Sequence, residues 1–195
     1  MKLILIKLVI FSFFLIGCSK SKDLKKNKIA PKTELIFPDD WLGYWEGNLE
    51  IYNALGLSQT IPMALDHQRT DTSGLYEWAI IYGEDTLEGR RDYFLKEIDA
   101  SLGLYEVDER NGIFLRSFVL GDKLVSTFEV EGTLITSIYT REKNNNMLFE
   151  IFASNTEKNK ITGDTIVNGE EIPIVNSYLS TAYQKGRLKK KTLSN

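Results

Sequence analysis

The chain has 195 residues, 43% of them hydrophobic, and a formal net charge of −3 at pH 7, which is enough material for one domain with a full core. Its basic residues gather near the two ends, so the stretch between residues 34 and 184 is strongly acidic, which argues against nucleic acids and other polyanions as ligands. One cysteine and one histidine exclude an internal disulfide and a zinc site made of four His or Cys ligands.

The first segment is an apolar run, from Leu3 to Gly17, that lysines precede and interrupt. It is shorter than the roughly 20 residues that a membrane-spanning helix needs, and it is typical of a signal peptide. The run ends in Leu15-Ile16-Gly17-Cys18, which resembles the lipobox of bacterial lipoproteins. The resemblance implies that residues 1–17 are removed and that Cys18 becomes a lipidated N-terminus. A plain secretory signal followed by an incidental cysteine is the alternative.

Residues 18–40 are predicted to be the lipidated cysteine and a lysine-rich tether. Six lysines and one acidic residue, Asp23, lie between Ser19 and Thr33, with little apolar content. Such a segment either lies along anionic headgroups or acts as a solvated spacer. In some bacterial groups, lipoproteins sent to the cell surface carry acidic residues directly after the cysteine, whereas this stretch is basic. We therefore expect a lipid-anchored protein of the bacterial cell envelope, in the outer membrane and facing the periplasm.

From Trp41 to Ala153, short runs rich in β-branched and aromatic residues recur about every ten residues between Gly, Asn and Asp turns. Asn111-Gly112 and Gly121-Asp122 are predicted hairpin turns, because these residues accept positive φ. The one helical candidate, Ala54–Leu57, is too short to predict a helix. The predicted strands are Glu46–Tyr52, Gln59–His67, Leu75–Tyr82, Gly89–Ile98, Leu102–Val107, Ile113–Leu120, Leu124–Glu131, Leu134–Thr140 and Met147–Ala153.

Alternation within these strands predicts one buried and one solvated face, as in Leu75–Tyr82, where every second residue is aromatic or apolar. Short loops make neighbouring strands antiparallel. We therefore predict an all-β domain over residues 41–184, an antiparallel up-and-down β-barrel of about 8 to 10 strands, which leaves no exposed sheet edge. A two-sheet β-sandwich is the alternative.

The region after Ser154 has a weaker pattern. Residues 155–160 are predicted to form a loop, and Ile161–Val167 and Glu171–Val175 are predicted to be extended. Tyr178–Leu188 stays open between a strand and a helix. Residues 185–195 are predicted to be a basic tail.

The start of the first strand carries Gly43-Tyr44-Trp45, which resembles the G-x-W signature that opens lipocalins and related calycin β-barrels. The resemblance implies that Trp45 closes one end of the barrel and that a late arginine packs on its ring by a cation–π contact. Arg187 is the candidate for that arginine. In the alternative, Trp45 is an ordinary core aromatic of a small hairpin.

The resemblance also implies an apolar or amphiphilic ligand inside the barrel. Tyrosines on an inward face would let a pocket hold an apolar body and fix a polar end. Plain core packing is the alternative role for each candidate. The predicted ligand-binding residues are Met63, Leu65, Tyr76, Trp78 and Tyr82.

No catalytic constellation is predicted. His67 is the only imidazole, and since no motif surrounds it we interpret it as a buried structural residue. Carboxylate runs such as Glu106-Val107-Asp108-Glu109 fall at predicted turns and match no calcium-binding loop, so we expect them to be solvated. The sequence therefore predicts no metal site and no cofactor.

Three functions remain open. The first is a membrane-anchored envelope lipoprotein that binds a small apolar or amphiphilic molecule. The second is a non-catalytic envelope module with a filled barrel, whose outer wall binds another protein. The third and least favoured is an enzyme that uses tyrosine, arginine and carboxylates in the pocket. The expected partners are the membrane, through the lipid anchor, and either a small molecule or an envelope protein.

Overall fold

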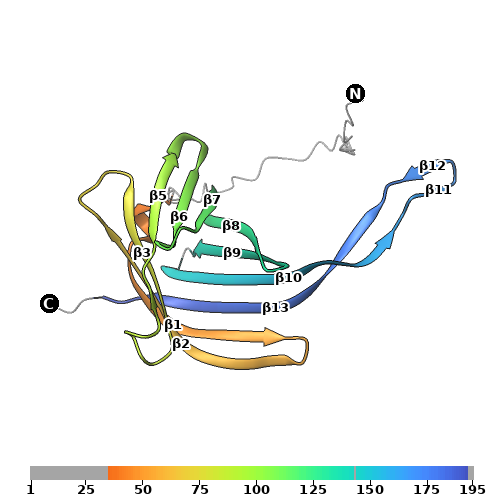
Figure 1. Cartoon of the computed structure of the whole chain (residues 1–195). Coiled ribbons are helices and arrows are strands. Elements are labelled where there is room, and N and C mark those ends of the chain that lie inside the picture. The colour runs from red at the N-terminus through yellow and green to blue at the C-terminus, as the bar shows by residue number, and fades with distance from the viewer. Residues whose placement is uncertain (1–34, 143, 193–195) are drawn as a thin grey trace, which may run out of the picture. The chain divides into compact units, whose positions relative to one another are not determined.

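Thirteen β-strands and two short 3-10 helices make up residues 35–142 and 144–192, the part of the chain that the computed structural model describes (Figure 1). These described residues belong to one compact unit. In chain order the elements are η1 (Asp39–Trp41), β1 (Gly43–Asn53), β2 (Gly56–Arg69), β3 (Leu75–Tyr82), β4 (Arg90–Arg91), β5 (Phe94–Asp99), η2 (Ala100–Leu102), β6 (Leu104–Asp108), β7 (Phe114–Leu120), β8 (Lys123–Val130), β9 (Thr133–Arg141), β10 (Asn146–Thr162), β11 (Thr165–Val167), β12 (Glu170–Ile172) and β13 (Val175–Lys190).

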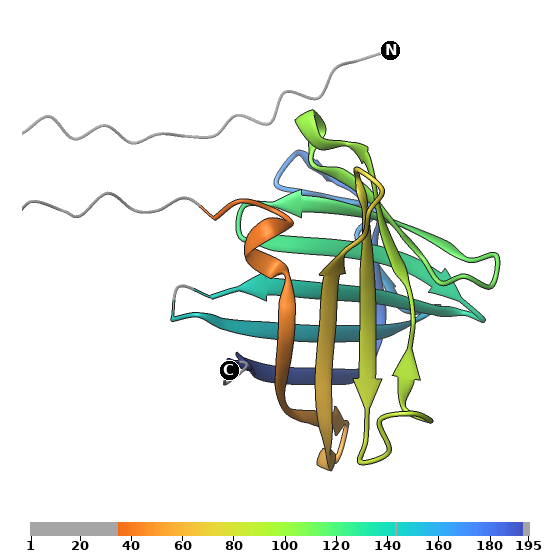
Figure 2. The same ribbon diagram turned by 90° about the vertical axis from the view of Figure 1, so that its left-hand side faces the viewer.

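Ten of these strands form a closed antiparallel barrel. The hydrogen-bonded order runs β2-β1-β13-β10-β9-β8-β7-β6-β5-β3, and a further ladder between β2 and β3 joins the two ends. Figure 2 shows β1, β2 and β3 crossing in front of β8, β9, β10 and β13. The prediction of an all-β up-and-down barrel is confirmed, and the sandwich alternative is wrong, because closure leaves one continuous ring instead of two separate sheets.

The tight turns between strands lie at glycines. Gly112 and Gly121 have φ of 96° and 65°, the left-handed region that the predicted hairpin turns require. Ala54–Leu57 is not helical: Gly56, with φ of 107°, turns the chain between β1 and β2, and Leu55 at the tip is 97% exposed.

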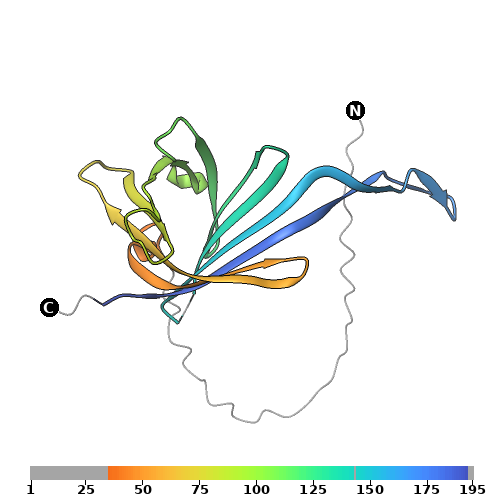
Figure 3. The same cartoon turned by 60° about the horizontal axis from the view of Figure 1, so that its bottom comes forward.

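The last part of the chain differs from the sequence prediction. Residues 155–160, expected to be a loop, continue β10, which pairs with β13 beyond the barrel, so that the two strands and the β11–β12 hairpin form a projecting arm (Figures 1 and 3). Tyr178–Leu188 is strand. Residues 185–190, expected to open a basic tail, lie in β13 and pair with both β1 and β10, so the domain boundary predicted at 184 falls inside a strand.

The core fills the barrel interior with the alternate residues of each strand. On β3, Tyr76, Trp78 and Ile80 are buried as the alternation predicts, but the expected solvated face is not, because Ala79 and Ile81 on that face are buried too. Trp41, from η1, and Trp45, from β1, are fully buried beside them. No helix within residues 35–142 and 144–192 combines the length and the apolar composition that crossing a membrane requires.

Candidate functional site

The interior of the barrel has two layers of side chains. One layer is fully packed, and the other encloses a cavity. We call Trp41, Trp45, His67 and Trp78 the floor cluster; all four side chains are fully buried. The Trp45 indole N–H donates to the Trp41 carbonyl oxygen at 3.0 Å, which ties β1 to η1. Trp45 is thus a fully buried aromatic of the first barrel strand, which is compatible both with the predicted closure of one barrel end and with the alternative of an ordinary core residue.

The arginine over the Trp45 ring is Arg141, not Arg187. The Arg141 guanidinium carbon lies 4.7 Å from the ring centroid, and Nε donates to the Asp40 carbonyl oxygen at 2.7 Å. Arg187 instead lies on the outside of the barrel, where it pairs with Glu142 at 3.0 Å. The neighbours of Arg187 on β13, Gly186 and Leu188, face inward, so Arg187 itself must face solvent.

His67 stacks on Trp78 inside the floor cluster, with ring centroids 3.5 Å apart and an interplanar angle of 7°. Its Nδ1 lies 3.2 Å from the Trp41 carbonyl oxygen. A carbonyl only accepts, so Nδ1 carries the proton of the neutral ring and Nε2 is a buried acceptor without a partner among the described residues. Burial lowers the pKa of His67 to about 3, although the hydrogen bond to Trp41 and the charge of Asp66 act to raise it. This buried, neutral ring fits a structural role.

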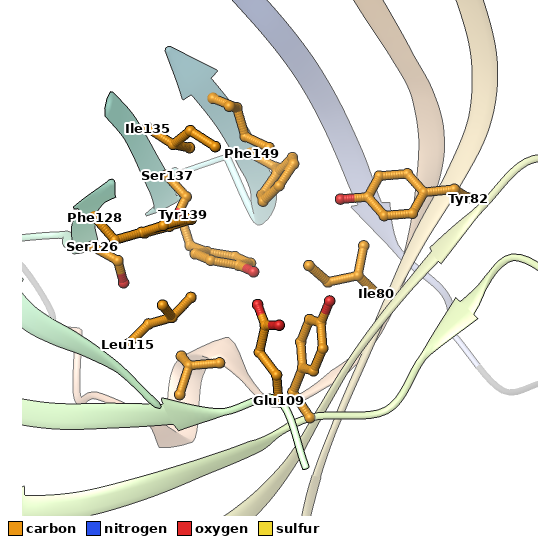
Figure 4. A pocket seen from close by; sticks show the side chains of 13 residues that line it. Ile80, Tyr82, Glu109, Leu115, Ser126, Phe128, Ile135, Ser137, Tyr139 and Phe149 are labelled. Atoms are coloured by element: carbon orange, nitrogen blue, oxygen red, sulfur yellow. The ribbon is translucent and has the colours of Figure 1, made fainter. Parts of the chain in front are cut away.

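Tyr139 connects the floor cluster to a cavity in the second layer. Its ring lies 5.8 Å from the Trp78 ring and 5.9 Å from the His67 ring, centroid to centroid, and it meets Phe149 edge-on at 5.0 Å. Beyond Tyr139 the barrel interior is hollow, with a cavity of about 120 Å³ (Figure 4). The cavity is lined by Ile80, Tyr82, Tyr93, Val107, Glu109, Leu115, Ser126, Phe128, Ile135, Ser137, Tyr139, Phe149 and Ile151.

Polar groups converge in this mostly apolar cavity. Figure 4 shows the Glu109 carboxylate and the hydroxyls of Tyr82 and Tyr139 pointing into the same space. Burial raises the pKa of Tyr139 well above its ordinary value, with Tyr82 and Tyr93 adding to the shift, and it raises the pKa of Tyr82 and of Tyr93 in the same way. These hydroxyls therefore stay protonated at neutral pH and can donate hydrogen bonds to a ligand.

Two serines extend the polar side of the cavity, and a third is hydrogen-bonded to one of them. Ser126 and Ser137 occupy paired positions on β8 and β9, and both line the cavity. The Ser126 hydroxyl is hydrogen-bonded to the buried hydroxyl of Ser117 on β7. The lining thus has hydroxyl groups on neighbouring strands and branched aliphatic side chains between them.

The sequence analysis identified one of the residues that line this cavity. Of the five predicted ligand-binding residues, Tyr82 lines it, whereas the structure packs the other four into the core: Met63, Leu65, Tyr76 and Trp78. Glu109 was expected to be solvated at a turn, and that expectation is wrong, because it lines the cavity and is half-buried. The signal that could have found it is its parity with Tyr105 and Val107, which also face inward.

Comparison with known proteins supports the fold and gives no information on function. No protein-family model matches the chain, and no curated protein matches its sequence. The structure is similar to the crystal structure of a protein of unknown function from the DUF3598 family of Nostoc punctiforme, with a TM-score of 0.56 and 12% sequence identity. The match covers 81% of this chain and 50% of that one. This likeness shows the fold alone.

The chain spans about half the length of that neighbour. The barrel within the described residues is a closed ring, because the first strand, β1, pairs with the last, β13, as well as with β2. Within residues 35–142 and 144–192, no three side chains of His, Cys, Asp or Glu gather where they could hold a metal ion. The candidate site is therefore the cavity itself.

Proposed function

We propose that the chain is a lipid-anchored envelope protein whose barrel binds a small amphiphilic molecule in the cavity beyond Tyr139. The observation that carries the proposal is the cavity, because protein interiors are normally packed to near crystal density. A hollow lined by aliphatic and aromatic walls with a few convergent polar groups is the usual form of a small-molecule site.

The size of the cavity limits what it can hold. A volume of about 120 Å³ is smaller than the roughly 300 to 1,000 Å³ of sites for drug-sized ligands, and it is close to the roughly 150 Å³ cavity that holds benzene. Several lining residues, including Glu109, Phe128 and Ile151, are only half-buried, so the cavity is open to solvent. We infer that a group about the size of a benzene ring enters the cavity and that any longer part of the ligand extends through the opening.

Bound ligand is expected to survive purification. Residues 19–195, which contain the whole barrel, purified from the native host without detergent and measured by native mass spectrometry, should carry an added mass of a small organic molecule. Replacement of Ser137 by phenylalanine places a ring in the cavity and should remove that mass. The surface substitution Thr136→Phe, on the same strand but outside the lining, serves as the control.

If the unsubstituted protein shows only its bare mass, the ligand-binding proposal fails. The favoured function would then be the protein-interaction module, and the arm is the surface that such a module would use. Its side chains are apolar and 49% to 69% exposed; they are Ile161, Ile166, Val167, Ile174, Val175, Tyr178 and Leu179.

The anchor is the second part of the proposal, and it rests on Leu15-Ile16-Gly17-Cys18. These residues lie outside the part of the chain that the structure describes. Expression of the full chain in a bacterium fed radiolabelled palmitate should label the protein and place it in the membrane fraction. Cys18→Ala should remove both the label and the cleavage that precedes the cysteine. Labelling that persists in Cys18→Ala would contradict the anchor.

A further inference from the structure

The cavity has one charged group and no countercharge. Among its thirteen lining residues, Glu109 alone carries a formal charge. None of the ion pairs within residues 35–142 and 144–192 includes Glu109. Its side chain accepts one hydrogen bond, from Asn111 Nδ2 at 3.3 Å. A half-buried carboxylate that has no ion-pair partner and accepts a single hydrogen bond favours a positively charged ligand and repels an anionic one.

The arginines that flank this region in the sequence form no ion pair with Glu109. Arg91 donates from Nη1 to the carbonyl oxygens of Glu88 and Arg90, at 2.8 and 3.0 Å, and its side chain does not line the cavity. The Arg110 guanidinium lies 4.9 Å from the centre of the Phe94 ring, also outside the lining. Arg91 keeps its positive charge and lowers the pKa of Tyr82 and of Tyr93 from outside the lining, against the larger effect of burial, but neither arginine forms an ion pair with Glu109. Within the lining, the Glu109 carboxylate is therefore the group that can pair with a positive ligand.

Aromatic side chains make up much of the remaining wall. Tyr82, Tyr93, Phe128, Tyr139 and Phe149 line the same cavity as Glu109. A cation is attracted to the face of such a ring when it lies within about 6 Å of the centroid, and the attraction grows when the cation is desolvated. In Figure 4 the rings of Tyr82, Tyr139 and Phe149 surround the space toward which Glu109 points. The aromatic rings and the Glu109 carboxylate can together stabilise a desolvated cation.

We propose that the cavity binds a small alkylated ammonium group, with its charge beside the Glu109 carboxylate and its alkyl groups against the aromatic and aliphatic walls. The inference rests on the proposed ligand-binding function and names the ligand class. A bare ammonium or metal ion is less favoured than an alkylated one, because most of the lining, including Ile80, Leu115 and Ile135, is apolar, and the few hydroxyl groups replace only part of a hydration shell. Alkyl groups in place of N–H groups weaken that hydration and fill the cavity, whose volume is of the right order for a trimethylammonium group.

The test compares two probes of the same shape. Choline and its uncharged isostere 3,3-dimethylbutan-1-ol are titrated into residues 19–195 by calorimetry or NMR. Choline is expected to bind about tenfold more tightly or better than the isostere. Glu109→Gln should weaken choline binding by about tenfold and remove the preference between the two probes. Glu77→Gln makes the same charge change on an exposed residue of β3 outside the lining, and it should leave choline binding unchanged.

A second pair of variants tests the aromatic wall. Tyr93→Leu should weaken choline binding, whereas Tyr93→Phe, which keeps the ring, should retain most of it. Cooperative urea unfolding of each variant checks that it folds. Equal binding of choline and the isostere overturns the ammonium inference but leaves the ligand-binding function standing. Binding of neither probe, together with a bare mass in native mass spectrometry, overturns both.

A trimethylammonium group is supplied either by a free compound or by a lipid headgroup, and a competition experiment separates the two sources. Vesicles of phosphatidylcholine and vesicles of phosphatidylglycerol are added to the choline complex. Displacement of choline by the first alone identifies a headgroup as the source, and displacement by neither identifies a free compound. Displacement by phosphatidylglycerol as well as phosphatidylcholine would overturn recognition of the ammonium group.

Discussion

Replacement of Trp45 by alanine is expected to lower the free energy of unfolding by about 3 to 5 kcal/mol. The ring is fully buried, packs in the floor cluster and lies under the guanidinium of Arg141. Its removal leaves a cavity that ten closed strands cannot easily collapse to fill, and the indole N–H bond to Trp41 is lost. Urea unfolding followed by circular dichroism measures the change.

The adjacent Tyr44 provides the matched control. It lies on the same strand with the opposite parity and is half-buried, so Tyr44→Ala should cost clearly less than Trp45→Ala. Arg141→Met, alone and combined with Trp45→Ala, completes a double-mutant cycle, and a coupling of about 0.5 to 2 kcal/mol is expected for the cation–π contact. A loss below about 1 kcal/mol for Trp45→Ala would contradict its place in the packed floor cluster.

The ring of strands follows from local patterns in the sequence. The alternation of Tyr76, Trp78 and Ile80 marks the inner face of β3, and glycines such as Gly112 and Gly121 mark tight turns. Because each turn is short, each strand must pair with the next, and the meander can then close with no long-range information beyond the number of strands. The barrel could therefore be predicted from the sequence.

The arm could not be predicted in the same way. The ladder between β10 and β13 shifts register at Ser154, Lys158 and Lys160, and the shifts at Ser154 and Lys160 reverse the faces on which alternate residues lie. The period-two signal is lost there, although the backbone remains paired. Outside the barrel no core selects apolar residues on one face, so the composition of residues 155–160 resembles that of a loop.

The choice of Arg187 over Arg141 shows a limit of reasoning from a resemblance. Both arginines lie on late strands, β13 and β9, but parity separates them: Ser137, Tyr139 and Arg141 face the interior. Arg141 also needs acceptors, which the carbonyl groups of Asp40, Glu142 and Asn146 supply from η1 and the β9–β10 turn. Those partners are distant in sequence or created by the turn, so the sequence pattern alone does not reveal them.

The division of the interior into a solid floor and a hollow layer is also a property of the whole barrel. Tyr82 and Trp78 lie on one face of one strand, yet one lines the cavity and the other is packed against His67. What separates them is the size of the side chains that the other strands bring to each layer: two further tryptophans in the floor, and Ser126 and Ser137 beside the cavity. Strand tilt decides which residues share a layer, and a single strand does not encode it.

Lowering the pH from 7 to 5 is expected to cost about 2 kcal/mol of stability through His67 alone. The native state holds this ring neutral, with a pKa of about 3, whereas in the unfolded chain its pKa is about 6.5. Between these values the unfolded state binds one more proton, so stability is fully present above about pH 6.5 and falls by about 1.4 kcal/mol per unit below it.

The window from pH 7 to pH 5 isolates this effect. Carboxylates whose pKa is lowered in the folded state, such as Asp85 and Asp108, lose their contribution only at lower pH, where they become protonated in the unfolded chain. His67→Phe keeps an aromatic ring against Trp78 but removes the titrating nitrogen, so its unfolding free energy should be nearly flat across the window. Equal slopes for the two proteins, measured by urea unfolding at each pH, would contradict the buried neutral histidine. Because His67 is the only histidine in the chain, no second imidazole can produce the same slope.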